Sequence, residues 1–166
     1  MTQQLNIELD ATLVNTVVKA TTDVLGTMAN TEVKFKEVWA ENNYHPHGDI
    51  SAMIGILGER GEGMITLSFT QDLAALMVSR LIGLEPDLLS EDDCADGVGE
   101  LVNMISGQTK TGLSNGHGAA YKLSLPTIIK GPNHQISSYP KNVPVLNAKF
   151  ETNGQFFNLQ IAFKVA

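Results

Sequence analysis

Hydrophobic and polar residues alternate along this chain with two different periods, which separate helical from extended segments. Apolar residues recur every three to four positions in three stretches, as amphipathic helices require. These predicted helices are residues 8–28, 71–84 and 90–113. Asp10 is expected to cap the first helix, whereas Ser90 and Asp93 resemble a capping box at the start of the third. Residues 115–118 are expected to end the third helix.

Stretches with a period of two, or with uniformly apolar residues, predict seven β-strands. Residues 33–39 alternate apolar and charged side chains, as a half-exposed strand does, whereas residues 50–57 are almost uniformly apolar, which suits a central strand. The Gly-rich residues 58–63 and the pair Asn153-Gly154 are hairpin signals. The predicted strands are residues 33–39, 50–57, 64–69, 121–124, 127–130, 143–151 and 156–163.

The order of these elements divides the chain into two similar halves. A helix and three strands come first, and helices followed by three or four strands come second. This order predicts an α+β fold in which pseudo-duplicated helix-plus-three-strand halves form one largely antiparallel sheet with helices packed on it. Residues 1–166 are expected to form a single domain, because this length suits one shared core. The repeat is expected in architecture alone, since no sequence identity between the halves is visible.

Composition and charge argue against several classes of protein. The formal net charge is −7 and the 11 Lys and Arg residues are scattered, which argues against nucleic-acid binding. No apolar stretch approaches the ~18–20 residues of a membrane helix, and residues 1–8 lack the basic and apolar regions of a signal peptide. We therefore expect a cytoplasmic protein with no membrane or nucleic-acid partner. The single cysteine, Cys94, excludes an internal disulfide and is expected to be inert.

The third predicted helix carries the strongest candidate for chemistry. Over residues 96–107, its apolar face consists of Val98, Leu101, Val102 and Ile105. Its opposite face consists of Asp96, Glu100, Asn103 and Gly107. A carboxylate and a carboxamide three residues apart are also common on solvated helices without any function. However, Gly97, Gly99 and Gly107 all cost helix stability, which indicates that another surface comes close to this helix.

Two other chemistries fit the sequence poorly. His45, His47 and Asp49 lie in one polar loop, but they lack helical spacing and a second ligand cluster, so a plain loop is favoured over a metal site. Ser106 and Ser114 have no His or acidic partner at any motif spacing, which argues against a nucleophilic enzyme.

The pattern Asp96-x-x-x-Glu100-x-x-Asn103, with Pro126 after 22 intervening residues, resembles the signature of the CheC/CheX/FliY chemotaxis phosphatases. Further stretches resemble CheX-like chains, and together they extend the resemblance over nearly the whole length. These stretches are residues 65–69, 81–84, 100–107 and 125–131.

The number of motifs separates the members of this family. CheC-like and FliY-like chains carry two motifs, one in each half, whereas CheX-like chains carry one. In the first half of this chain, Thr12 and Val38 stand where the motif has Glu and Pro, although Asn15 matches it. The resemblance therefore implies a CheX chemotaxis phosphatase with a CheC-like fold.

Such a resemblance implies hydrolysis of the aspartyl phosphate on a phosphorylated CheY-like response regulator, in chemotaxis or another two-component signalling pathway. Asn103 would insert its side-chain amide and orient the attacking water, and Glu100 would pair with a Lys of the regulator. No cofactor of its own is expected, because the Mg²⁺ would belong to the regulator. Gly107 would keep the approach open, Pro126 would shape the turn behind the site, and Asp96 is a supporting or partner-contacting candidate.

Two further interpretations stay open beside catalysis. The same fold serves as a non-catalytic binding module in the middle domain of FliM, although the pair Glu100 and Asn103 argues against a pure scaffold. CheX-like chains also pair through sheet edges, and exposed final strands would allow such pairing here, so a homodimer is expected and is compatible with catalysis.

Overall fold

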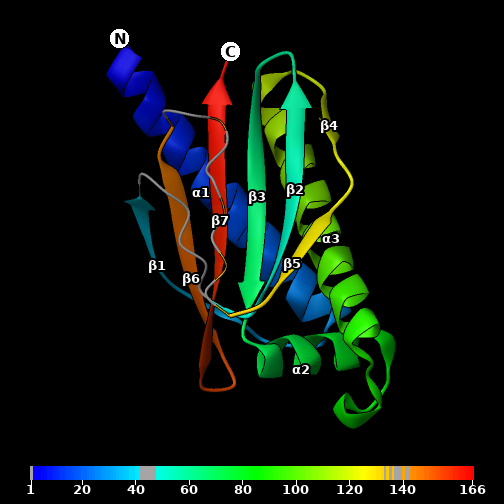
Figure 1. The fold of residues 1–166 in the computed structure, drawn as a ribbon. Helices are drawn as coiled ribbons and strands as arrows, with labels where there is room; N and C mark the ends of the chain where they lie inside the picture. The colour runs from blue at the N-terminus through cyan, green and yellow to red at the C-terminus, as the bar shows by residue number, and fades with distance from the viewer. Residues whose placement is uncertain (1, 42–47, 133, 135, 137–139, 141–142) are drawn as a thin grey trace.

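The computed structural model describes residues 2–41, 48–132, 134, 136, 140 and 143–166, with only the backbone described for residues 2–10. Helices and strands follow one another along the chain as Figure 1 shows. The helices are α1 (Thr2–Met28), α2 (Gln71–Ile82), the short 3₁₀ helix η1 (Pro86–Leu88) and α3 (Glu91–His117). The strands are β1 (Lys34–Glu41), β2 (Ile50–Gly58), β3 (Gly61–Phe69), β4 (Tyr121–Leu123), β5 (Thr127–Lys130), β6 (Val145–Thr152) and β7 (Gln155–Val165).

These strands form one antiparallel sheet. Its order is β1-β6-β7-β3-β2-β4, and β5 pairs with β2 further along the same edge. α1 and α3 cover one face of the sheet, and α2 lies across one end of it (Figure 1). The predicted α+β fold, with helices packed on a largely antiparallel sheet, is therefore confirmed.

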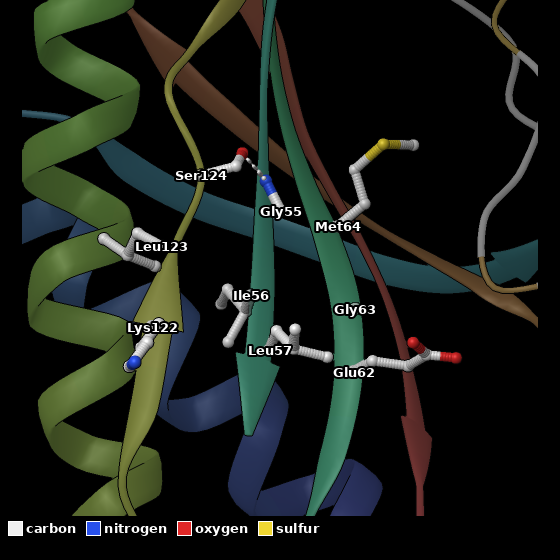
Figure 2. A pocket seen from close by; sticks show the side chains of 9 residues that line it. All are labelled: Gly55, Ile56, Leu57, Glu62, Gly63, Met64, Lys122, Leu123 and Ser124. Atoms are coloured by element: carbon white, nitrogen blue, oxygen red, sulfur yellow. Dashed lines mark hydrogen bonds between the residues drawn. The ribbon is translucent and has the colours of Figure 1, made fainter. Parts of the chain in front are cut away.

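The outer neighbour of β2 is interrupted in the middle. β4 pairs with residues 56–58 and β5 with residues 50–53, so residues 124–126 leave the ladder between them. Ser124 is hydrogen-bonded to Gly55 of β2 in this gap. Its Oγ accepts a hydrogen bond from Gly55 N at 2.8 Å (Figure 2). Its backbone N donates one to Gly55 O at 2.9 Å. The interrupted segment thus stays attached to the sheet by side-chain and backbone bonds.

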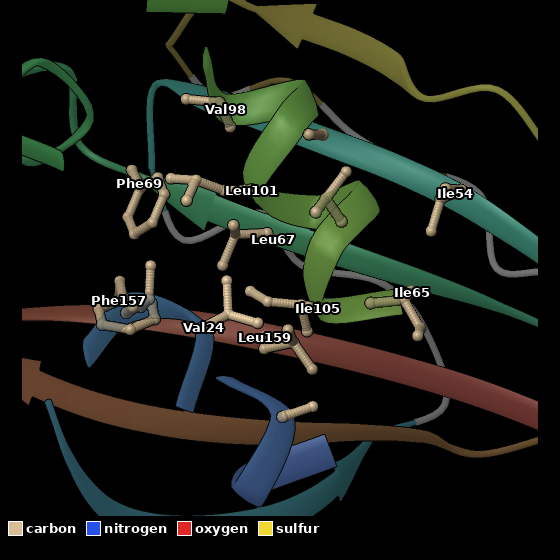
Figure 3. Close-up of a cluster of buried hydrophobic side chains, with 14 of the residues drawn as sticks. Val24, Ile54, Ile65, Leu67, Phe69, Val98, Leu101, Ile105, Phe157 and Leu159 are labelled. Atoms are coloured by element: carbon tan, nitrogen blue, oxygen red, sulfur yellow. The ribbon is translucent and has the colours of Figure 1, made fainter. Parts of the chain in front are cut away.

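The core lies between the sheet and the helices (Figure 3). Leu101 and Ile105 of α3 join one buried cluster with Leu67 of β3, Leu159 of β7 and Val24 of α1. All four positions of the predicted apolar face have 0% exposure, namely Val98, Leu101, Val102 and Ile105. Because full burial of such a side chain is worth ~1.5–3 kcal/mol, this face fixes the rotation of α3 about its own axis.

The two halves exchange strands about a pseudo-twofold axis. β1 pairs with β6 of the second half, β4 and β5 pair with β2 of the first, and β3 and β7 meet in the centre. Buried positions of α1 recur in α3 88 residues later, as Leu13 and Leu101 illustrate. The matching pairs are Leu13 and Leu101, Val17 and Ile105, Thr21 and Thr109, and Leu25 and Leu113. Three of these four pairs are identical residues, so the predicted repeat in architecture is accompanied by a limited likeness where both helices face the core.

Helix ends differ from the predictions at two places. α1 begins at Thr2, so Asp10 lies inside the helix and does not cap it; residues 2–10 contain neither Pro nor Gly, so nothing in them stops helix propagation. α3 continues to His117 and ends at Gly118, whose φ of 61° is the left-handed conformation of a helix cap. The predicted capping box is confirmed, since Ser90 Oγ accepts from Asp93 N at 3.0 Å and Asp93 Oδ2 accepts from Ser90 N at 3.1 Å.

Candidate functional site

α3 presents the candidate residues along one side. Asp96, Glu100 and Asn103 are exposed, and Gly107 is half-buried one turn beyond Asn103. The opposite side of the same helix is the buried apolar face described above. The predicted division of this helix into a buried face and an exposed face is therefore confirmed.

Glycines let neighbouring helices approach α3 closely. A Cβ atom on Gly97 would lie 2.4 Å from Val78 Cγ1 of α2, and one on Gly112 would lie 2.6 Å from Thr16 Cγ2 of α1. These two glycines therefore serve packing within the chain. A Cβ atom on Gly107 would meet nothing within 4 Å, so this glycine borders open space.

A hollow of about 360 Å³ opens between the exposed side of α3 and the interrupted strand. We call it the α3 hollow. Its lining includes Asp96, Glu100 and Asn103 from α3, and Leu125, Pro126 and Ile128 from the strand side. The structure thus brings four of the five predicted site residues together, and Gly107 lies outside this lining.

Pro126 lies in the bend between β4 and β5 and also lines the α3 hollow. Its expected role in shaping a turn at the site stays a prediction. A Cβ atom on Gly99 would lie 3.8 Å from Pro126 Cβ and 3.2 Å from Ile128 Cδ1. The absence of a side chain at Gly99 therefore eases the packing of Ile128 on α3, whereas the distance to Pro126 is an ordinary contact.

The surface around the α3 hollow is acidic. Asp92, Asp96 and Glu100 are exposed at intervals of four residues along α3. Among the described residues that line the hollow, none carries a basic side chain. A surface of this kind favours a partner with positive charge at the facing position.

Leu125 lines the hollow but was missed by the sequence analysis. Its side chain is 88% exposed, the highest value among the large hydrophobic residues that the structure describes. The sequence contained one signal for its exposure. Leu125 is an apolar residue between Ser124 and Pro126, in a segment too short to form a strand.

The other nucleophile candidates are placed away from the hollow. Ser106 has 0% exposure inside α3, so its hydroxyl does not reach the surface. Cys94 is 2% exposed, and burial raises the pKa of its thiol above the ordinary value. Burial thus keeps both side chains from the surface, and the raised pKa lowers the fraction of reactive thiolate at Cys94.

The polar loop that was considered as a metal site lies mostly outside the described residues, because these exclude His45 and His47. Asp49 is described, and its Oδ2 accepts a hydrogen bond from Gln71 N at 3.0 Å at the start of α2. Within the described part of the chain, no group of three His, Cys, Asp or Glu residues could hold a metal ion. None of the helices described is both long enough and apolar enough to span a membrane.

Comparison with known proteins links this architecture to one family. The model of the family described as chemotaxis phosphatase CheX matches residues 50–151. A chemotaxis protein CheX from Desulfovibrio desulfuricans is 33% identical, with a TM-score of 0.80, and the match covers 93% of this chain and 99% of that chain. A search of curated proteins gave no match.

Two further solved structures are similar. A putative chemotaxis protein from Desulfovibrio vulgaris Hildenborough is 33% identical with a TM-score of 0.81, and the match covers 92% of this chain and 96% of that one. The CheX of Borrelia burgdorferi, solved in a CheX–CheY–BeF3–Mg²⁺ complex, is 22% identical with a TM-score of 0.71, over 91% of this chain and 97% of that one. The second of these shows similarity of fold.

Proposed function

This chain belongs to the CheX family of chemotaxis phosphatases, and we propose that it hydrolyses the aspartyl phosphate of a CheY-type response regulator. One observation carries this proposal. Glu100 and Asn103 are exposed one turn apart on α3, in a hollow that a partner surface can enter. The complex of Borrelia burgdorferi CheX with CheY, BeF3 and Mg²⁺ supports the choice of partner class.

The proposed role of Asn103 is to position water. Its Oδ1 accepts a hydrogen bond from a water molecule, whose oxygen then attacks the phosphorus in line with the bond to the aspartyl oxygen. That P–O bond breaks, the aspartate leaves as a carboxylate with the electron pair, and inorganic phosphate keeps the new P–O bond and both protons of the water, one of them on another phosphate oxygen. A carboxamide does not act as a base near neutral pH, so Asn103 contributes orientation alone.

The proposed role of Glu100 is to fix the docking geometry. Its exposed carboxylate lies one helical turn before Asn103 and pairs with a cation on the regulator, for which a Lys beside the phosphorylation site is the natural donor. Two contacts one turn apart define both the position and the direction of α3 on the partner. We propose that the Mg²⁺ belongs to the phosphorylated regulator, where it offsets the charge of the phosphoryl group.

The alternative is a binding module that recognises the regulator without hydrolysing its phosphate. A phosphate-loss assay with a phosphorylated CheY-type regulator of the same organism separates the two. We expect the wild-type protein to accelerate the loss and Asn103→Ala to abolish this acceleration. Asn15→Ala is the matched control, because Asn15 is an exposed residue of α1 that lies 88 positions before Asn103. Measurable binding without acceleration by the wild-type protein would support the binding module instead.

A further inference from the structure

The interrupted strand beside the α3 hollow has a counterpart that is not divided. β1 occupies the equivalent edge of the other half and pairs with β6 over its whole length, apart from one irregularity between Phe35 and Glu37. On the second half, β4 and β5 are separate, and residues 124–126 bend out between them. The interruption therefore belongs to the half that carries Glu100 and Asn103.

Ser124 fixes the start of this bend. Its hydroxyl accepts a hydrogen bond from Gly55 N at 2.8 Å (Figure 2). The same hydroxyl donates one to Leu125 O at 3.1 Å. Its backbone N donates to Gly55 O at 2.9 Å. The side chain of Ser124 thus supplies the hydrogen-bond acceptor that a paired strand would offer to Gly55 N of β2, and it also binds the carbonyl oxygen of Leu125.

Pro126 and Ile128 fix the other end of the bend. Both lie against the bare backbone of α3 at Gly99, where a Cβ atom would be 3.8 Å from Pro126 Cβ. The residue before a proline is also restricted to extended conformations, which limits the backbone of Leu125. The segment is therefore held at both ends, and little conformational entropy remains to be lost when a partner binds it.

Leu125 lies at the tip of this fixed segment. Single exposed apolar residues are common on protein surfaces and need no explanation by themselves. Leu125 differs in three respects: it is 88% exposed, it lies between the hydrogen-bonded Ser124 and Pro126, and it lines the same hollow as Glu100 and Asn103. An exposed apolar side chain that a partner covers leaves water on binding, and such buried anchors contribute much of the binding free energy at protein interfaces.

We propose that Leu125 is an apolar anchor that packs against the response regulator next to its phosphorylation site. This inference rests on the proposed function, because the regulator is the occupant that it assigns to the hollow. Leu125 shares the hollow with Asn103, so the partner residues that cover it border the pocket that Asn103 enters. We therefore expect the regulator to present an apolar patch to Leu125. This patch lies next to the cation that pairs with Glu100.

Replacement of Leu125 separates binding from chemistry. For Leu125→Ala we expect KM for the phosphorylated regulator, and Kd for the regulator loaded with beryllofluoride and Mg²⁺, to rise about tenfold, as loss of one apolar anchor does. The kcat should stay near the wild-type value, because Asn103 is intact. Leu125→Met keeps most of the apolar surface, so its KM and Kd should stay within about twofold of the wild-type values.

The matched control is Leu57→Ala. Leu57 is also an exposed leucine, at 62%, but it lies on β2 and does not line the α3 hollow. We expect wild-type KM and Kd for this variant. Active wild-type protein with an unchanged KM in Leu125→Ala would overturn the anchor and leave the proposed function intact. Inactive wild-type protein would overturn the proposed function itself, and the Kd series with the beryllofluoride complex would still decide whether Leu125 contacts the regulator.

Discussion

Thr21 of α1 and Thr109 of α3 make the same hydrogen bond at equivalent places in the two halves. Each Oγ1 donates to the carbonyl oxygen four residues earlier, Val17 O and Ile105 O, and both distances are 2.8 Å. The interior of the protein therefore preserves the duplication in detail. On the exposed sides, Thr12 lies where the second half has Glu100, whereas Asn15 and Asn103 are identical.

Glu100 is predicted to contribute to binding through its charge. We expect Glu100→Gln to raise Kd for the beryllofluoride-loaded regulator about tenfold, a value between those of exposed and fully desolvated ion pairs. Titration by fluorescence or calorimetry measures the effect. Asp92→Asn is the matched control, because Asp92 is exposed on the same side of α3 but does not line the hollow, and its change should stay below about twofold at physiological ionic strength. Equal effects of the two variants would show that general acidity, and not a specific pair at Glu100, governs docking.

Gly107 is predicted to keep the approach to Asn103 open. Gly107→Ala should stabilise the protein by up to ~1 kcal/mol, because alanine favours the helix and its Cβ meets nothing within the chain. The same methyl group should weaken binding of the regulator, since it projects one turn beyond Asn103. Gly116→Ala is the control, as its Cβ also meets open space but lies near the end of α3. Urea unfolding and Kd measure both quantities, and unchanged binding in Gly107→Ala would contradict this role.

Cys94 is predicted to react slowly with thiol reagents. Burial raises its pKa, so at a given alkaline pH the folded protein holds less of the reactive thiolate than the unfolded chain does. The pH at which labelling accelerates should therefore be higher for the folded protein than for the protein in urea. Absorbance-monitored labelling across pH gives both profiles. Coincident profiles would mean that the thiol is accessible and unperturbed.

Dimer formation through a sheet edge is a further proposal. The final strands were expected to supply this edge, but β6 and β7 each have a neighbour on both sides, so that part of the expectation is wrong. β1 is an edge strand with β6 as its only neighbour in the described sheet, and Phe35 and Val38 on it are 40% and 41% exposed. Light scattering at micromolar concentration should give twice the 17.9 kDa of one chain. Val38→Lys should shift the mass toward the monomer, because the charge opposes apolar contact at this edge. A monomer mass for the wild-type protein would contradict the proposal.

The parts of the site that sequence predicts best are those governed by local pattern. The two faces of α3 follow from helical periodicity, and the bond between Ser90 and Asp93 follows from their spacing. Other features depend on contacts between distant segments. Gly97 is explained by Val78 of α2, which becomes a neighbour only after the helices pack.

The position of Leu125 shows the same limit. Its exposure depends on the interruption between β4 and β5, and this in turn depends on the register of both strands along β2. Strand register is set by pairing across the sheet, so propensity and spacing do not reveal it. The repeat between the helices was detectable in principle, because four buried positions recur at one spacing, but only their burial distinguishes them from chance matches.

The most direct test of the central claim is a single-turnover measurement of phosphate loss from the regulator at saturating concentrations of this protein. Saturation removes differences in binding, so the rate constant reports on the hydrolytic step. The account predicts that Asn103→Ala reduces this rate constant to that of the regulator alone, while Asn15→Ala matches wild type. Wild-type turnover by Asn103→Ala would contradict the claim that this carboxamide positions the attacking water.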